Sequence, residues 1–281
     1  MNILDRIVER TKERIREEKR QIPLCEMRAR AEGADGRGYL FEEALRKEGL
    51  SFICEVKKAS PSKGVIASEF PYLEIAKDYE MGGAAAISCL TEPFWFQGSD
   101  RYLEEIAESV SIPVLRKDFT CDEYMVFQAK AMGASAILLI CSVLDDGALK
   151  SYHQLAEELG MSALVEAHSP EEIERAKAAG ARIIGVNNRD LKNFTVDIGH
   201  SMKLRKLVGP ETLFVSESGI RGPEDMRALY ESGTDAVLIG EMLMRSLDRK
   251  ETLRSLQSAA AHEKDTGNAD MKQEKIREGW E

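Results

Sequence analysis

Ionisable and amide side chains recur at the ends of short apolar segments in this sequence. Five segments end in such groups, which are Glu55 with Lys57, Lys117 with Asp118, Glu166 with His168, Asn187, and Glu217. Converging carboxylates and ammonium groups shift one another's pKa values, which general acid–base catalysis at neutral pH requires. No serine or cysteine nucleophile stands beside a histidine in this set, so the set favours proton transfer over acyl transfer. Taken singly, each group has an ordinary structural explanation, such as a salt bridge or a turn.

The segments that carry these groups have the pattern of buried parallel strands. Eight of them span residues 51–57, 84–90, 112–117, 135–141, 162–166, 182–187, 212–217 and 235–240. Each is too short for a helix and is apolar at both alternating sets of positions, and helical patterns separate them. One such helix follows Ser169-Pro170, where an N-cap serine precedes a first-turn proline.

This alternation predicts the α/β class and a single (β/α)8 TIM barrel over residues 51–258. In such a barrel the active site lies at the C-terminal ends of the strands, where the ionisable groups stand. An open doubly wound sheet is the alternative. Its dinucleotide-binding form should carry G-x-G-x-x-G after the first strand, whereas residues 57–64 read KKASPSKG.

Two segments fall outside the predicted barrel. Residues 1–50 predict an N-terminal helical extension that contains a charged amphipathic helix, a glycine-rich link and a short helix near residues 41–47. At the other end, residues 259–281 form a charged tail, in which 10 of the last 20 residues are charged. We expect this tail to be frayed or disordered, because few apolar residues are available to hold it.

The composition excludes several classes of protein. The 281 residues include 49 acids and 39 bases, and the net charge of −10 argues against nucleic-acid and polybasic membrane partners. No apolar run approaches the ~20 residues that span a bilayer, and the first residues lack a secretory pattern. The five cysteines are widely spaced and the four histidines are unpaired, so we expect buried free thiols and no metal site. A cytoplasmic location follows as an expectation.

Two glycine-containing turns and an aromatic run indicate a ligand. Ser218-Gly219 and Gly240 follow the last two strands, where backbone N–H groups can approach a phosphate. These glycines have an alternative role in tight turns. Residues 94–96 are three successive aromatic side chains, which suit either a flat apolar substrate or the packing of a lid.

Seven motifs in chain order resemble indole-3-glycerol-phosphate synthase of tryptophan biosynthesis. They are EVKKASPSKG (55–64), LTEPFWFQGS (90–99), VLRKDF (114–119), LVEAH (164–168), GVNNRDL (185–191), SESGI (216–220) and IGEMLMR (239–245). The resemblance covers essentially residues 1–258. It implies that 1-(2-carboxyphenylamino)-1-deoxyribulose 5-phosphate closes to indole-3-glycerol phosphate with loss of CO2 and water. It also implies a phosphorylated small-molecule substrate, no cofactor and no metal.

The resemblance further implies a role for each matching residue. Lys117 would protonate the ketone oxygen on ring closure, Lys57 would bind the carboxylate or act in dehydration, and Glu166 would be the general base. Glu55 and Glu217 would orient the lysines, and Asn187 would hydrogen-bond the substrate. The binding residues would be Ser60, Ser218, Gly219 and Gly240 for the phosphate, Phe96 and Phe119 for the aryl ring, and Arg189 for an anionic group. Glu241 stands where the family often has Ser or Thr, so only its backbone N–H is available there.

Two other functions fit parts of this pattern. Another phosphate-handling barrel, such as an isomerase with one acid–base pair, would not need two lysines together with an aromatic loop. A catalytically inactive barrel that serves as a scaffold would have lost at least one ionisable strand end, and none is lost. With eight strands already assigned, we expect a monofunctional chain that acts as a monomer or a weak homo-oligomer.

Overall fold

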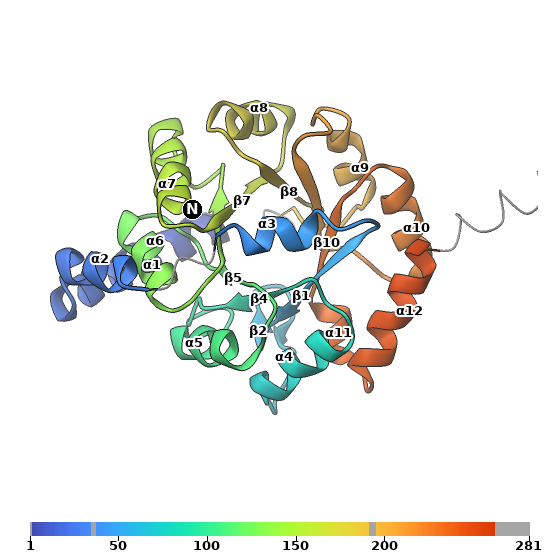
Figure 1. The fold of residues 1–281 in the computed structure, drawn as a ribbon, viewed down its shortest axis with the longest axis horizontal. Helices are drawn as coiled ribbons and strands as arrows, with labels where there is room; N and C mark the ends of the chain where they lie inside the picture. The colour runs from blue at the N-terminus through green and yellow to red at the C-terminus, as the bar shows by residue number, and fades with distance from the viewer. Residues whose placement is uncertain (1, 35–37, 191–194, 262–281) are drawn as a thin grey trace, which may run out of the picture.

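Eight parallel strands close into a barrel in the computed structural model, which describes residues 2–34, 38–190 and 195–261 (Figure 1). The strands are β1 (Ser51–Val56), β4 (Ala86–Leu90), β5 (Val114–Lys117), β6 (Ala136–Ile140), β7 (Ser162–Ala167), β8 (Ile183–Asn187), β9 (Leu213–Glu217) and β10 (Ala236–Ile239). β1 pairs in parallel with both β4 and β10, which closes the ring. The TIM-barrel prediction is therefore confirmed, and the open sheet is excluded.

Helices alternate with the strands and cover the outside of the barrel (Figure 1). They are α4 (Tyr72–Met81), α5 (Asp100–Ser109), α6 (Glu123–Ala131), α7 (Asp146–Glu158), α8 (Pro170–Ala178), α9 (Gly199–Arg205), α10 (Pro223–Glu231), α11 (Glu241–Arg245) and α12 (Arg249–Ala261). The start of α8 has the predicted cap, because Ser169 Oγ accepts the N–H of Glu172 at 3.2 Å. Gly180 follows α8 with φ of +92°, a left-handed conformation that favours glycine.

The barrel strands bury apolar side chains on both faces. Outward residues such as Val165 and Val237 pack under the helices in the larger core. Inward residues fill the N-terminal half of the barrel, and they include Ile53, Ala86, Leu115, Ala136, Leu164, Ile183, Leu213 and Ala236. Because side chains alternate along a strand, the next inward positions stand at the C-terminal end of the barrel.

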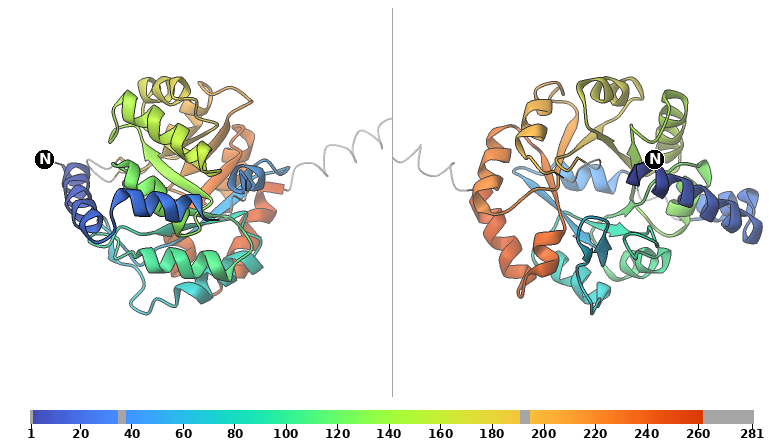
Figure 2. Two further views of the ribbon diagram at one scale, coloured as in Figure 1. Left: turned by 60° about the vertical axis from the view of Figure 1, so that its left-hand side comes forward. Right: turned by 180° about the vertical axis from the view of Figure 1, so that it is seen from behind.

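The N-terminal extension covers both ends of the barrel. It contains α1 (Ile3–Gln21), α2 (Leu24–Glu32) and α3 (Leu40–Leu45). α3 lies over the N-terminal end in Figure 1, and the right panel of Figure 2, seen from behind, shows α1 on the opposite side. We did not predict α2, which packs Met27 and Ala31 against α6. A two-stranded antiparallel hairpin, β2 (Ala59–Ser60) and β3 (Gly64–Val65), follows β1 and was also not predicted.

Other expectations from the sequence concern the cysteines, membranes and the tail. All five cysteines are free, and Cys54, Cys89 and Cys141 are buried as expected, whereas Cys25 is exposed. Across the described ranges, no helix is long and apolar enough to cross a bilayer. α12 extends to Ala261, and residues 262–281 of the predicted tail lie outside the described residues. The domain boundary at residue 258 stays a prediction.

Candidate active site

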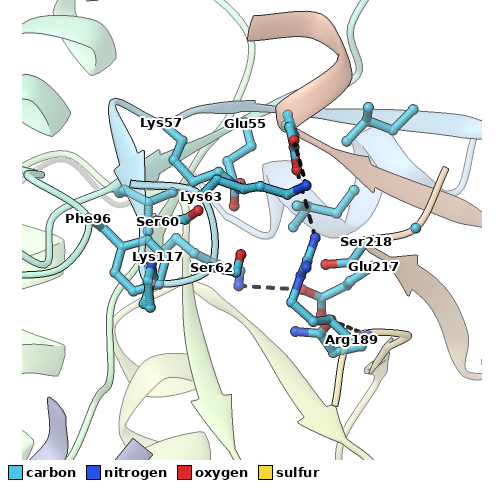
Figure 3. A pocket seen from close by; sticks show the side chains of 18 of the residues that line it. Glu55, Lys57, Ser60, Ser62, Lys63, Phe96, Lys117, Arg189, Glu217 and Ser218 are labelled. Atoms are coloured by element: carbon cyan, nitrogen blue, oxygen red, sulfur yellow. Dashed lines mark hydrogen bonds and ion pairs between the residues drawn. The ribbon is translucent and has the colours of Figure 1, made fainter. Parts of the chain in front are cut away.

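A cavity of about 680 Å³ opens at the C-terminal ends of the strands (Figure 3). Its walls include every residue that we predicted for the site: Glu55, Lys57, Ser60, Phe96, Lys117, Phe119, Glu166, Asn187, Arg189, Glu217, Ser218, Gly219 and Gly240. The barrel brings them together because seven of its loops and strand ends meet around one axis. Further walls come from α1 and from charged residues that the sequence did not single out.

Lys117 stands at the end of β5 among carboxylates from other strands. Its Nζ lies 3.4 Å from Glu217 Oε2 and 3.7 Å from Glu166 Oε2. Both carboxylates are buried and Lys117 is mostly buried, so these contacts lie in a medium of lower dielectric constant than water. A second pair, Glu55 with Lys57, is hydrogen-bonded across the end of β1.

Two glycines on the barrel wall leave room for these carboxylates. A side chain at Gly185 would overlap the carboxylate of Glu217, and one at Gly240 would overlap that of Glu55. Gly240 therefore makes space for the Glu55–Lys57 pair, in addition to any contact of its backbone with a ligand. The glycine positions and the acidic positions depend on one another across neighbouring strands.

The charges of this cluster perturb its pKa values. Burial lowers the pKa of Lys117, but the carboxylates of Glu217, Glu166 and Glu55 outweigh burial and raise it overall. Burial, reinforced by Glu166 and Glu55, raises the pKa of Glu217 to about 8 against the opposing effect of Lys117. The pKa of Glu55 is lowered, because Lys57 and Lys117 outweigh its burial. Lys117 and Glu55 are therefore charged at neutral pH, and Glu217 keeps its proton to a higher pH than an ordinary carboxyl group does.

His168 lies on the far side of Glu166 from Lys117. Its Nε2 is 3.5 Å from Glu166 Oε1, and its Nδ1 is 3.7 Å from Glu172. Burial lowers the pKa of His168, but the hydrogen bond to Glu172 and the charge of Glu166 raise it overall. His168 is not among the residues that line the cavity, so it contacts Glu166 from outside it.

The aromatic loop after β4 divides its side chains between the cavity and packing. Phe96 lines the cavity beside Phe119, with 5.9 Å between ring centroids. The buried carboxylate of Glu92 accepts the N–H groups of residues 94, 95 and 96 at 2.7–3.0 Å, which fixes the loop. Phe94 lies under the guanidinium of Arg10 instead. Phe96 is therefore placed where it could contact a ligand, whereas Phe94 packs against the N-terminal helix.

Helix α1 forms an apolar wall of the cavity through Ile3, Leu4 and Ile7. A buried ion pair holds it in place, because Arg14 donates to Asp118 Oδ2 at 2.8 Å. Asp118 lies between Lys117 and Phe119 in the chain. The amphipathic pattern of α1 was visible in the sequence, but the surface that its apolar face covers was not.

The opposite side of the cavity is rich in backbone turns and cations. Ser218 and Gly219 have φ of +65° and +88°, and they turn the chain sharply after β9. Asn187 Oδ1 accepts the N–H of Arg189 at 3.1 Å, a turn contact that is common for an asparagine at the end of a strand. The charged residues Lys63, Arg221, Glu241 and Arg245 also line this side. Of these, sequence reasoning had singled out only Glu241, since charged loop residues usually face solvent.

The cavity brings carboxylates and cations together in pairs. Among the residues that the structure describes, no three His, Cys, Asp or Glu side chains are grouped to hold a metal ion. The carboxylates of the cavity face lysines. The side of the cavity with Phe96 and Phe119 is apolar, and the side with Ser218 and Gly219 carries cations and sharply turned backbone. This arrangement suits proton transfer on a small molecule that has an apolar ring at one end and an anion at the other.

Comparison of the sequence with known proteins gives one family, both from the family model and from individual relatives. The indole-3-glycerol phosphate synthase family matches residues 4–256. A protein of that name from Ruminiclostridium cellulolyticum is 51% identical over 259 residues, which are 92% of this chain and 100% of the relative. Another from Endomicrobium trichonymphae is 53% identical over 255 residues, with coverage of 90% and 99%.

Solved structures share the barrel at low sequence identity. The 3-hexulose-6-phosphate synthase of Salmonella typhimurium has a TM-score of 0.63 at 14% identity and covers 75% of this chain and 99% of its own. A thiamine phosphate pyrophosphorylase from Pyrococcus furiosus has a TM-score of 0.58 at 16% identity, with coverage of 78% and 97%. At this identity the likeness extends to the fold alone.

Proposed function

The chain belongs to the indole-3-glycerol phosphate synthase family, and we propose how its residues share the reaction. It is a carboxy-lyase of tryptophan biosynthesis that forms indole-3-glycerol phosphate, CO2 and water from 1-(2-carboxyphenylamino)-1-deoxyribulose 5-phosphate. One observation supports the assignment of roles above all others. Lys117 lies within 3.7 Å of two buried carboxylates at the end of the barrel that carries the cavity.

Lys117 is the acid of ring closure in this proposal. The ring carbon that bears the carboxylate attacks the ketone carbon, a C–C bond forms, and the ketone oxygen takes a proton from the ammonium group. The raised pKa of Lys117 keeps that proton present at neutral pH. Glu217 lies against the ammonium group and positions it, and the ionised Glu55 stabilises the cation that forms on the substrate ring.

Decarboxylation and dehydration follow from the same arrangement. The ring cation accepts the electron pair of the breaking C–CO2 bond, so no cofactor is needed as an electron sink. The new hydroxyl group then leaves as water with a second proton, and a proton leaves the neighbouring carbon as the indole forms. Lys57 is the second ammonium group and Glu166 is the base, with Lys117 and His168 on its two sides.

The remaining residues bind the substrate. Phe96 and Phe119 pack on the anthranilate ring, and Asn187 hydrogen-bonds a hydroxyl or carbonyl group. Arg189 anchors an anionic group, and the phosphate is held by Ser60 and by the backbone of residues 218–219 and 240. All of these groups line one cavity, and we propose that the chain acts as a monomer or a weak homo-oligomer. We also propose a cytoplasmic location, as befits a biosynthetic enzyme.

The test is a cyclisation assay without added cofactor or metal. Purified protein is incubated with the carboxyphenylamino-deoxyribulose phosphate, and indole fluorescence and released CO2 are followed together. We expect one CO2 for each indole formed. Well-folded protein that gives no indole signal would overturn the assignment.

A further inference from the structure

Three cationic side chains surround one carboxylate at the rim of the cavity. Glu241 Oε1 lies 3.3 Å from Arg245 Nε and 3.6 Å from Lys63 Nζ, and Glu241 Oε2 lies 3.8 Å from Arg189 Nη2. All four side chains line the cavity, and Figure 3 shows Lys63 extending from its hairpin across the pocket. The cations come from three separate parts of the chain: the β2–β3 hairpin, the segment after β8, and α11.

This carboxylate occupies an unusual position. The same rim carries the turned backbone of Ser218 and Gly219, which the proposed function assigns to the substrate phosphate. A phosphate dianion that approached Lys63 and Arg189 would meet the negative charge of Glu241 between them. Like charges that share a site repel, so the carboxylate and the phosphate compete for the same cations.

We propose that Glu241 is a built-in counter-ion, which occupies the cation cluster in the free chain and gives way when the substrate phosphate binds. This proposal rests on the proposed function. Glu241 is free to move aside, because its side chain is 29% exposed and stands at the first position of α11 rather than inside the barrel. Lys63 and Arg245 are about half exposed, so their side chains can pair either with Glu241 or with a bound phosphate.

The counter-ion gives the site a means of selecting its ligand. A small phosphate gains only the cation contacts, and displacement of Glu241 offsets part of that gain. The full substrate also packs its aryl ring against Phe96 and Phe119, so it can displace the carboxylate and still bind tightly. Glu241 therefore lowers the affinity for every phosphate ligand, and only a ligand with the further aryl contacts still binds tightly enough to occupy the site.

The test compares Glu241→Gln with wild type in two measurements. Calorimetry with inorganic phosphate measures affinity without any turnover, and steady-state kinetics gives KM for the full substrate. Partly exposed ion pairs of this kind are each weak, so we expect the Kd of inorganic phosphate to fall by about five-fold in Glu241→Gln. KM should fall in the same direction.

Two further variants isolate the charge at this position. Glu241→Asp keeps the carboxylate and should bind inorganic phosphate more weakly than Glu241→Gln does. Glu224→Gln removes one negative charge from α10 outside the cavity wall, so it should leave both constants at the wild-type value. If Glu224→Gln gained as much affinity for inorganic phosphate as Glu241→Gln does, the change in net charge alone would explain the gain, and the proposal would be overturned.

The proposal also fails if Glu241→Gln leaves the Kd of inorganic phosphate unchanged or raises it, since the carboxylate would then be neutral or would organise the cations for binding. Failure of the proposed function has a different signature. In that case wild-type protein gives no indole product, whereas the phosphate titration still reports on Glu241.

Discussion

The two ends of the barrel interior differ in polarity, and the change takes place over two residues along a strand. Along β5 the inward side chain changes from Leu115 to Lys117, and along β7 it changes from Leu164 to Glu166. Leu115 and Leu164, at the N-terminal end, belong to a close-packed apolar core. Lys117 and Glu166, at the C-terminal end, face one another as buried charges. Burial of apolar groups stabilises the fold, and burial of charges costs stability unless they are well paired. The comparison therefore separates a stabilising layer at the N-terminal end, the lower layer, from the layer that we propose to be catalytic at the C-terminal end, the upper layer.

The largest expected effect is in the upper layer. Lys117→Ala removes the proposed acid of ring closure, and we expect kcat to fall at least ~100-fold, the usual contribution of a general acid. Steady-state indole formation measures kcat, and circular dichroism checks that the barrel is intact. Turnover close to wild type would mean that another group donates the proton, and that the upper layer is catalytic for some other reason.

The next effect is in the lower layer. Leu164→Ala opens a cavity two residues before Glu166 on the same face of β7, where Leu164 is fully buried. We expect the free energy of unfolding to fall by about 3 kcal/mol, as for other buried leucines. Urea unfolding measures this change, and kcat per folded molecule should stay near the wild-type value. If kcat fell as far as in Lys117→Ala, the two layers would not be separable.

The position of the charged residues at one end of the barrel could be predicted from the sequence, because it follows from the two-residue period of the strands. The eight apolar segments and the two-residue repeat were enough to place Glu55, Lys117 and Glu217 at one end of one barrel. The cap at Ser169 fixed the start of α8 in the same way, through a local contact.

Features that depend on packing between distant segments could not be predicted. The apolar face of α1 was visible, but nothing local showed that it forms a wall of the cavity or that Arg14 would pair with Asp118. Lys63 and Arg245 read as ordinary surface charges, because their approach to Glu241 depends on the paths of a hairpin and a short helix. The raised pKa of Glu217 depends on its depth in the barrel, which no local pattern encodes.

The smallest expected effect is a dependence of stability on pH, which measures how much stability the buried carboxyl group of Glu217 costs. The pKa of Glu217 is about 8 in the folded chain, whereas its ordinary value is 4.5. The folded state therefore binds this proton more tightly than the unfolded state does. The stabilisation that results is fully present below pH 4.5 and is lost as the pH rises toward 8. Glu217→Gln is neutral at every pH and escapes this loss.

We therefore expect the Tm of Glu217→Gln relative to wild type to increase by about 5 °C between pH 6 and pH 9, measured by thermal unfolding at fixed ionic strength. The other ionisable groups are shared by the two proteins, so the difference in Tm isolates Glu217. An equal difference at both pH values would mean that Glu217 is already ionised at pH 6 and is held by Lys117 as a conventional ion pair. A widening difference, together with a lower kcat, would show that the chain gives up stability at this carboxylate in return for its place in the catalytic layer.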